Sequence, residues 1–488
     1  MKKTIYLALL LSIFNMVSGQ DWDMKLGASS AALKFNKSNV VQKSMFIGAS
    51  EGGVVLLRYQ DSKTEEPYLV SYNIDLVEQN VEMLPFDKKQ TYHVGYLNGD
   101  EIDLVQTYVE NGNFVVNHLI YDANTLKLKQ TEQLAAHEYN AQCSFFVKES
   151  QTKKSVATVF LYVTNSGAQC MVASYNRMIE ENWNIDYYTD LFDDFVVTDD
   201  GKVAILGSGT IKGASKTHLK FSLLSNGKEE IYEADKSIGD VFRLRLLGYG
   251  DGMFYCTGLI KSEHWAENSH YDFASGYFTL AYDSNSKSIS AYNVHNMTKD
   301  ELCSIANIPT NKFGNEDIQL SKLFVVSSCV DEDGAIFVLQ CTYDLYYYAS
   351  FDRTIYDGFY LVRLAKDGNL EWSKVIRHSS AAVGNKLRAA TKFRLVKTGD
   401  TYNLFYLEKQ KNLTLPGTRM YDQLYMGRGQ FDMQVLTIDR NGNYTRKFFP
   451  LVKNSIILGS PYLMENGKCL MLLSQSNGSN TAILDPKK

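Results

Sequence analysis

The amino-acid sequence predicts an all-β protein built from repeated pairs of β-hairpins. Apolar residues alternate with polar residues in short runs, the pattern of strands with one buried face, and short turns rich in Asp, Asn and Gly join these runs in pairs. Only seven prolines occur in 488 residues, and no Ser/Gly-rich or charged tract divides the chain, so the sequence favours one large domain. A hydrophobic share of 45% and an aromatic share of 12% are sufficient for a large core.

Each repeating unit begins with one hairpin and continues with a second. The first hairpins turn at short Gly-containing segments such as "TDDGK" and "DEDGA", and they span residues 195–206, 242–256, 324–341, 393–407 and 462–473. The second hairpins include "FYLVRLAKDGNLEWSKVI" from Phe359 and "DMQVLTIDRNGNYTRKFF" from Asp432. Two successive hairpins make a four-stranded antiparallel sheet, and early spacings of about 46 to 52 residues are close to the period of propeller repeats.

Eight units are predicted, and the last lacks a fourth strand because only "NTAILDP" follows its first hairpin. A spare strand is present in "AALKFNKSNVV" (31–41), and a ring that takes this strand into its last sheet leaves no open edge. The sequence therefore predicts a single β-propeller of four-stranded antiparallel blades closed by an N-terminal strand. Eight blades are preferred, with seven as the alternative because the first three units are weakly marked. The predicted units start near Phe46, Tyr92, Gln142, Thr189, Val241, Leu323, Lys392 and Gly459.

The first 19 residues have the layout of a secretory signal peptide. Lys2 and Lys3 precede an apolar run over residues 5–17, which is too short for a membrane-spanning helix, and no cysteine lies near the cleavage point to carry a lipid. We expect residues 1–19 to be removed, leaving a propeller domain over 20–488, exported and without membrane insertion. Because the chain ends within the last predicted blade, with no appended sorting domain, we expect the periplasm, with the cell surface or secretion as alternatives.

One helix is predicted, in a long insertion near 296–322 between the fifth and sixth units. In "MTKDELCSIANI", Thr298 and Glu301 have the spacing of a capping box, and an apolar face follows.

The stretch "DGFYLVRLAKDGNLEWSKVI" (357–376) resembles the outer hairpin of β-propeller repeats in exported proteins of the Bacteroidota and, more distantly, the quinoprotein-type blade. In both, an aliphatic strand leads to an Asp-Gly or Asn-Gly turn, followed by a Trp that packs between blades. The resemblance implies a fold and a compartment, and no catalytic residues. The Trp position is not repeated from blade to blade, which argues against a quinone cofactor, and we expect no cofactor. The four tryptophans are Trp22, Trp183, Trp265 and Trp372.

Composition and motifs favour a protein without enzymatic activity. The net charge of −5 is mixed along the chain, so there is no basic surface for nucleic acid or an anionic membrane. No GxSxG, HExxH, P-loop or EF-hand sequence occurs, and His264 and His270 do not have a zinc spacing, so we expect no catalytic residue and no metal site. The seven cysteines are scattered without a CxxC, as expected for buried strand residues.

Three long loops are predicted between the second and third strands of units five, six and seven, at 260–276, 342–358 and 408–430. In a propeller such loops lie on one face, and adjacent blades place them side by side. Loops of this length are uncommon without a function, and Trp, Tyr and Arg are enriched at the centres of protein interfaces. The candidate binding residues are Trp265, Tyr271, Tyr346, Tyr347, Tyr348, Arg353, Tyr421, Tyr425 and Arg428.

The sequence thus favours a non-enzymatic scaffold that binds a protein partner in the cell envelope, such as an accessory subunit of an outer-membrane transport, secretion or assembly complex. Another interpretation is that the tyrosines pack the loops onto the ring. The alternative function is a carbohydrate-binding or carbohydrate-cleaving propeller, with Trp265 or the tyrosines at 346–348 stacking on sugars. Cleavage requires two carboxylates at a defined separation, and no pair of acids stands out from the turn aspartates.

Overall fold

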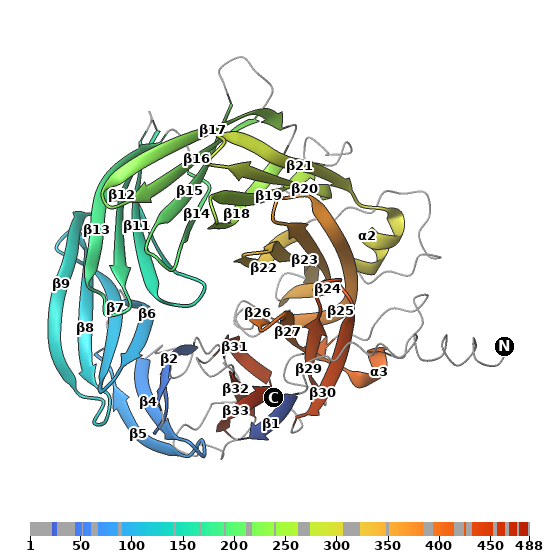
Figure 1. Cartoon of the computed structure of the whole chain (residues 1–488). Helices are drawn as coiled ribbons and strands as arrows, with labels where there is room; N and C mark the ends of the chain where they lie inside the picture. Colours follow the sequence, from blue (N-terminus) through green and yellow to red (C-terminus); the bar gives the residue numbers. More distant parts are fainter. Residues whose placement is uncertain are drawn as a thin grey trace, which may run out of the picture.

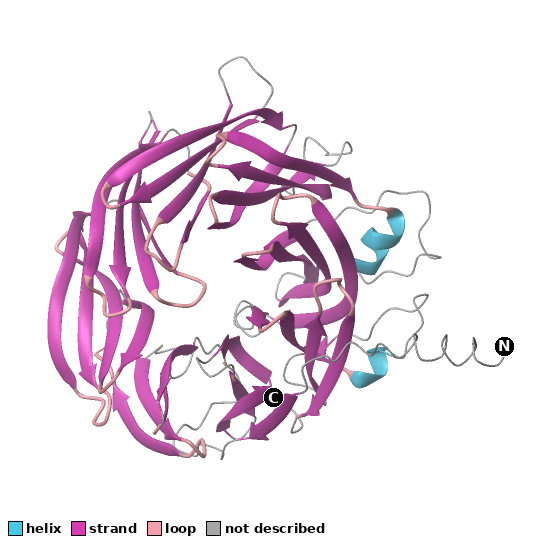
Figure 2. Ribbon diagram, viewed as in Figure 1, coloured by secondary structure: helices cyan, strands magenta, loops and turns pink. Residues whose placement is uncertain are grey.

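The computed structural model describes most of the chain from Trp22 to Pro486, as a ring of β-sheets (Figure 1). The described residues are 22–26, 44–50, 52–59, 67–85, 90–139, 143–164, 167–189, 192–210, 217–238, 241–261, 274–305, 323–347, 351–383, 394–413, 424–425, 432–451, 456–463, 468–475 and 478–486. Almost all of them are in strands or in the turns that join strands (Figure 2).

The described strands form eight sheets, of which seven have four antiparallel strands and one has a fifth short strand. In order from the innermost strand, blade 1 has β2 (Ser44–Ser50), β3 (Gly53–Tyr59), β4 (Pro67–Asn73) and β5 (Glu78–Met83). Blade 2 has β6 (Thr91–Asn98), β7 (Glu101–Glu110), β8 (Asn113–Asp122) and β9 (Leu128–Glu138). Blade 3 has β10 (Cys143–Glu149), β11 (Ser155–Thr164), β12 (Gly167–Asn176) and β13 (Glu181–Thr189). Blade 4 has β14 (Asp194–Val197), β15 (Val203–Thr210), β16 (Thr217–Ser225) and β17 (Lys228–Ile238).

The second half of the ring follows the same plan. Blade 5 has β18 (Val241–Gly250), β19 (Met253–Lys261), β20 (Ala274–Asp283) and β21 (Ser288–Asn296). Blade 6 has β22 (Leu323–Asp331), β23 (Gly334–Tyr347), β24 (Phe351–Ala365), β25 (Leu370–Val383) and β28 (Leu424–Tyr425). Blade 7 has β26 (Arg394–Thr398), β27 (Thr401–Glu408), β29 (Asp432–Ile438) and β30 (Tyr444–Pro450). The closing blade has β31 (Ile456–Leu463), β32 (Cys469–Gln475), β33 (Gly478–Pro486) and β1 (Trp22–Leu26).

The predicted all-β single propeller is therefore confirmed. Every predicted unit start lies close to the first residue of an innermost strand, the largest difference being Thr189 against Asp194. The innermost strands contact one another in sequence order around the ring, and β31 contacts β2, which closes the circle.

Closure by an N-terminal strand is also confirmed, but the segment differs from the predicted one. β1 pairs antiparallel with β33, with Met24 opposite Leu484, whereas residues 31–41, the predicted closing strand, lie outside the described residues. In "WDMKL" apolar residues alternate with Asp23 and Lys25, so one side of this short strand can face the core. Met24 packs accordingly against the apolar cluster shared by the seventh and closing blades.

The core lies between adjacent blades, where the faces of neighbouring sheets pack together. Between blades 6 and 7, Val338 and Leu361 pack in one cluster with Leu404 and Leu436. The predicted inter-blade Trp also lies here, since Trp372 packs against this cluster and its Nε1 donates to the Arg440 carbonyl of the β29–β30 turn at 2.9 Å. Burial of these apolar faces fixes each blade against the next.

One turn extends across the ring. Gln151, between β10 and β11 of blade 3, donates from Nε2 to Cys329 Sγ at 2.9 Å and accepts from the Val330 backbone N–H at 3.3 Å. Both partners are on β22 of blade 6. From the same turn, Lys153 Nζ lies 5.7 Å from the centroid of the Phe46 ring on β2. The turn thus links blades 1, 3 and 6 near the centre of the ring (Figure 1).

A helix is present at the place where the sequence predicts one. α2 (Lys299–Ile305) begins with the expected capping box. The Thr298 backbone N–H donates to Glu301 Oε2 at 2.7 Å, and the Glu301 backbone N–H donates to Thr298 Oγ1 at 3.3 Å. A second short helix, α3 (Gln410–Leu413), follows β27.

Candidate functional site

Blade 6 has much longer strands than the other blades. Its β23, β24 and β25 have 14, 15 and 14 residues, whereas the second and third strands of the other blades have at most 10. The sheet of blade 6 is therefore longer along its strands than the sheets of the other described blades.

The extension begins where the strand register changes. The pairing of β23 with β24 shifts between Gln340 and Thr342 and then continues from Thr342 opposite Tyr356 as far as Tyr347 opposite Phe351. β25 accompanies this hairpin to Val383. We call residues 342–347, 351–357 and 379–383 the arm. Six strand residues span roughly 20 Å, so the arm is a large projection for one blade.

The tyrosine-rich stretch 342–358 is therefore mostly strand, and the prediction that it forms a loop is wrong. Tyr, Phe, Ile and Thr favour strands, so the hairpin continues past Cys341 instead of ending there. Of the candidate binding residues, Tyr346 and Tyr347 lie in β23 and Arg353 lies in β24. Tyr348 lies outside the described residues.

The third predicted loop supplies the additional strand of the sheet. In β28, Leu424 and Tyr425 pair in parallel with Ser380 and Ala381 of the arm. Tyr343, Ile355, Ala381 and Tyr425 consequently form one row across four strands. The long segments of units six and seven lie side by side, as the sequence predicts.

Four of the nine candidate residues are thus brought into one sheet, namely Tyr346, Tyr347, Arg353 and Tyr425. The other five, Trp265, Tyr271, Tyr348, Tyr421 and Arg428, lie outside the described residues. A role in binding stays a prediction for all nine.

A fully buried pair of ionisable side chains lies at the base of the arm. His378 Nδ1 lies 2.9 Å from Glu408 Oε2, and the two side chains are 1% and 0% exposed. The other carboxylate oxygen, Oε1, accepts from Asn412 Nδ2 at 2.7 Å and from the Lys409 backbone N–H at 2.8 Å. Since His378 is on β25 and Glu408 ends β27, the pair connects blade 6 to blade 7.

Aromatic rings enclose this pair. The His378 ring is stacked on Phe359, with centroids 5.0 Å apart and planes inclined by 18°. Tyr406 lies edge-on to the same imidazole, with centroids 5.5 Å apart. A buried carboxylate in such surroundings requires hydrogen-bonding partners, and His378, Asn412 and Lys409 provide them.

The opposite side of blade 6 contacts α2. Tyr360 OH donates to Glu301 Oε1 at 2.6 Å and lies 2.9 Å from His295 Nε2. Burial alone would raise the pKa of Glu301, but hydrogen bonds from Tyr360 and Thr298 outweigh it and lower that pKa. At Gly358 there is little space, because a Cβ there would lie 3.1 Å from Ile305 Cα.

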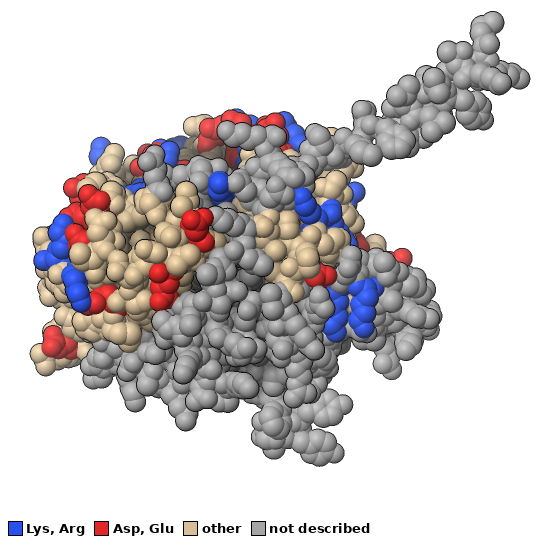
Figure 3. Space-filling model, turned by 90° about the horizontal axis from the view of Figure 1, so that it is seen from below, with Lys and Arg blue, Asp and Glu red and all other residues tan. Residues whose placement is uncertain are grey.

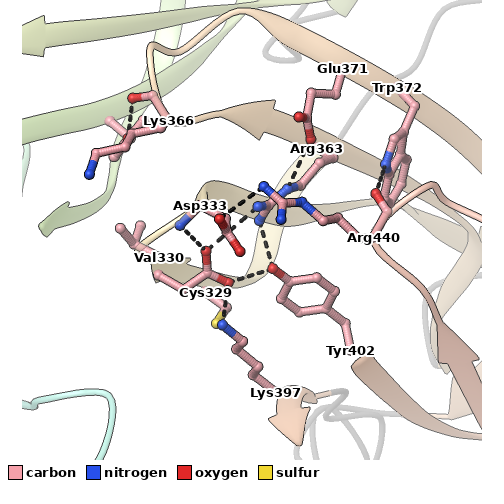
Figure 4. Close-up of polar contacts among 12 residues, drawn as sticks. Cys329, Val330, Asp333, Arg363, Lys366, Glu371, Trp372, Lys397, Tyr402 and Arg440 are labelled. Carbon is pink, nitrogen blue, oxygen red and sulfur yellow. Dashed lines mark hydrogen bonds and ion pairs between the residues drawn. The ribbon is translucent and has the colours of Figure 1, made fainter. Parts of the chain in front are cut away.

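A second polar network lies at the other end of the interface between blades 6 and 7 (Figure 4). Arg363, which is fully buried, donates from Nη1 to Tyr402 OH at 2.7 Å and from Nε to Glu371 Oε2 at 3.3 Å. Asp331 accepts a hydrogen bond from Tyr402 and pairs with Lys397 Nζ at 3.1 Å. Burial raises the pKa of Tyr402, so this phenol stays protonated and is no general base. The network therefore joins blades.

The part of the chain that the structure describes shows no group of three His, Cys, Asp or Glu side chains placed to hold a metal ion. Burial raises the pKa of the Cys329 thiol to about 11 and that of Cys170 to about 12, so neither is a ready nucleophile. Within the same residues no helix is long and apolar enough to cross a membrane. Acidic and basic side chains are interspersed on the face in Figure 3.

The sequence did not identify His378, Glu408 or Gly358 as residues of the site. His378 and Glu408 are 30 residues apart, and each resembles an ordinary polar residue near the end of a strand. Gly358 stands beside Asp357, where the sequence reads as a turn. Only the register shift of β24 against β25 between Asp357 and Phe359 brings these positions together.

No protein-family model and no curated protein matches the chain. Among solved structures, Chaetomium thermophilum Sqt1 bound to the N-terminus of ribosomal protein L10 aligns with 93% of this chain and 99% of its own, at 10% identity and a TM-score of 0.40. The polysaccharide lyase Uly1 aligns with 94% of this chain and 99% of its own, at 10% identity and a TM-score of 0.38. The β-propeller domain of the Trilobed protease from Pyrococcus furiosus aligns with 83% and 95%, at 10% identity and a TM-score of 0.35. At such low similarity these likenesses carry no argument about function.

Proposed function

We propose that this protein is a non-enzymatic propeller scaffold that binds a protein partner through the arm of blade 6. The arm itself is the observation that carries the proposal. Ring closure and blade packing require only strands of ordinary length, yet β23, β24 and β25 continue beyond the register shifts at Gln340 and Phe359. The arm is also joined by β28, which comes from the chain segment between β27 and β29 of the adjacent blade.

The composition of the arm supports a protein partner. Residues 342–358 contain five tyrosines and one arginine, residue types that combine a large contact area with hydrogen-bonding groups. A sheet fixed to a rigid ring also presents these residues at a lower entropic cost than a loop would. The signal peptide predicted in the first 19 residues supports a cell-envelope setting for this interaction, with the periplasm as the proposed compartment.

The experiment is affinity purification of the tagged protein from envelopes of the source cells, followed by mass spectrometry. The test variant changes Tyr346, Tyr347 and Tyr348 to Ala. The control changes Tyr139 and Tyr444, which are 44% and 41% exposed outside the arm, to Ala. We expect a stoichiometric partner with the wild type and the control, and a loss of at least tenfold with the arm variant. Equal recovery with the arm variant would refute the proposal.

The carbohydrate alternative is tested by binding to a panel of polysaccharides. Saturable binding of one glycan that Trp265→Ala abolishes, together with no captured protein, would replace the proposed function with that alternative. No specific observation in the described residues favours it over a protein partner.

A further inference from the structure

We infer that the buried pair of His378 and Glu408 positions the arm, and that α2 supports the arm from the other side of the sheet. That this positioning helps the arm to bind a partner rests on the function proposed above. That it keeps the backbone of the arm ordered follows from contacts within this chain and does not depend on a partner.

The base of the arm is defined by two register shifts in the sheet of blade 6. The two pairings made by β24, with β23 and with β25, change register at the same level. β23 shifts against β24 between Gln340 and Thr342, and β24 shifts against β25 between Asp357 and Phe359. A β-bulge bends a strand and increases its twist, so two bulges at one level set the angle between the arm and the blade.

The second step is that the bulge in β25 places His378 in the interface with blade 7. The paired residues on either side are Ile376 and Ser379, so Arg377 and His378 lie within the bulge. His378 then meets Glu408 at 2.9 Å in a fully buried position. The bulge that bends the arm therefore also places His378 in a buried contact with Glu408 of blade 7.

The third step is that Glu408 connects this base to the strand added to the arm. Glu408 is the last residue of β27, and it accepts hydrogen bonds from the first turn of the segment that continues through α3 to β28. Because β28 pairs with Ser380 and Ala381, the same segment holds the arm at its base and at its edge. Loss of the Glu408 carboxylate removes the hydrogen bonds that hold this segment at the base of the arm.

The fourth step is the support from α2. The backbone of α2 lies directly against Gly358 at the bulge, where an added Cβ would be 3.1 Å from Ser304 O, Ile305 Cα and Ile376 O. Glu301 of α2 is bonded to Tyr360, two residues further along β24. A side chain at position 358 therefore requires the backbone of α2 or β25 to shift by a few tenths of an ångström.

The experiment is hydrogen exchange with mass spectrometry on the purified protein, following amides in peptides covering 342–357. With Glu408→Ala, His378 remains buried without its carboxylate, so we expect arm amides to exchange at least tenfold faster than in the wild type. Glu408→Gln retains the acceptor for Asn412 and Lys409, so the arm should exchange at close to the wild-type rate. Gly358→Ala should accelerate exchange in the arm and in α2 together.

The matched control is another buried histidine–carboxylate pair, in blade 2. His118 Nε2 lies 2.7 Å from Asp103 Oδ1, and both side chains are nearly buried. Asp103→Ala should accelerate exchange in β7 and β8 while leaving the arm protected. The inference is overturned if Glu408→Ala and Gly358→Ala leave the arm protected, or if Asp103→Ala exposes the arm equally. Exchange needs no partner, so absence of a captured partner would reject the proposed function and leave this result standing.

Discussion

At the scale of single residues, the network around Arg363 makes the clearest prediction about stability. Arg363 is fully buried, and Asp331 is its partner closest to the centre of the ring. Asp331→Ala leaves the guanidinium with Glu371 as its remaining carboxylate partner among the described residues, and breaking a buried ion pair in this way costs up to about 3 to 5 kcal/mol. We expect a loss of that order in the free energy of unfolding of the protein, measured by chemical denaturation at pH 7.

The Asp331 carboxylate also makes the free energy of unfolding depend on pH. Burial alone would raise the pKa of Asp331, but hydrogen bonds from Tyr402, the Asp333 backbone and Lys397 outweigh it, and the pKa is lowered. A group with a lowered folded-state pKa stabilises the protein above its unfolded pKa, about 3.9 for Asp, and this contribution is lost as the pH falls through the folded value. The free energy of unfolding of Asp331→Asn should therefore fall less than that of the wild type as the pH is lowered below about 3.9.

The control for both measurements is the exposed ion pair between Asp251 and Lys366, whose side chains are about 60% exposed. Surface pairs of this kind contribute little to stability, so Asp251→Asn should leave the profile unchanged. Acid profiles that coincide for the wild type and Asp331→Asn would show that the network has no stabilising role.

At the scale of elements, α2 depends on its N-cap. Thr298 is exposed, and its hydroxyl accepts from the Glu301 backbone N–H and donates to Glu301 Oε2, so Thr298→Ala removes both of these hydrogen bonds. Loss of such a cap costs about 1 kcal/mol. We expect faster hydrogen exchange in α2 with little change in global stability, and Thr298→Ser should retain the wild-type rate. Unchanged exchange with Thr298→Ala would mean that contacts with β24 and β25 alone order the helix.

Elements with local signals were predictable from the sequence. Alternating apolar runs and Gly-containing turns placed the innermost strands within a few residues, and the spacing of Thr298 and Glu301 identified the start of α2. The closing strand was misassigned because a five-residue strand such as Trp22–Leu26 carries too little pattern to compete with a longer apolar run. The sequence predicts a loop at 342–358 instead of strands because tyrosines and aspartates occur in both strands and binding loops.

The pairing of distant residues could not be predicted in the same way. His378 meets Glu408, and Gln151 meets Cys329, only because of the curvature of the ring and the bulges in its strands. Those features depend on register, which a single sequence does not specify at the ends of strands. Residues at the base of the arm therefore became recognisable only in the folded molecule.

At the scale of the whole molecule, the blades form a closed ring, and the arm of blade 6 is the part that departs from the four-stranded plan of the other described blades. β1 closes the last sheet, apolar faces join neighbouring blades, and the turn at Gln151 links opposite sides. Blade 6 alone extends its second, third and fourth strands together and receives a strand from its neighbour among the described sheets. We propose that a protein partner binds the arm.

The most direct test is photo-cross-linking in intact cells, with Tyr347 in the arm replaced by a photoreactive phenylalanine and Tyr444 on the outer strand of blade 7 replaced in the same way as a reference. If the arm binds a protein, irradiation should give one discrete cross-linked product from position 347 and none from position 444. No product from position 347, or the same products from both positions, would contradict the account.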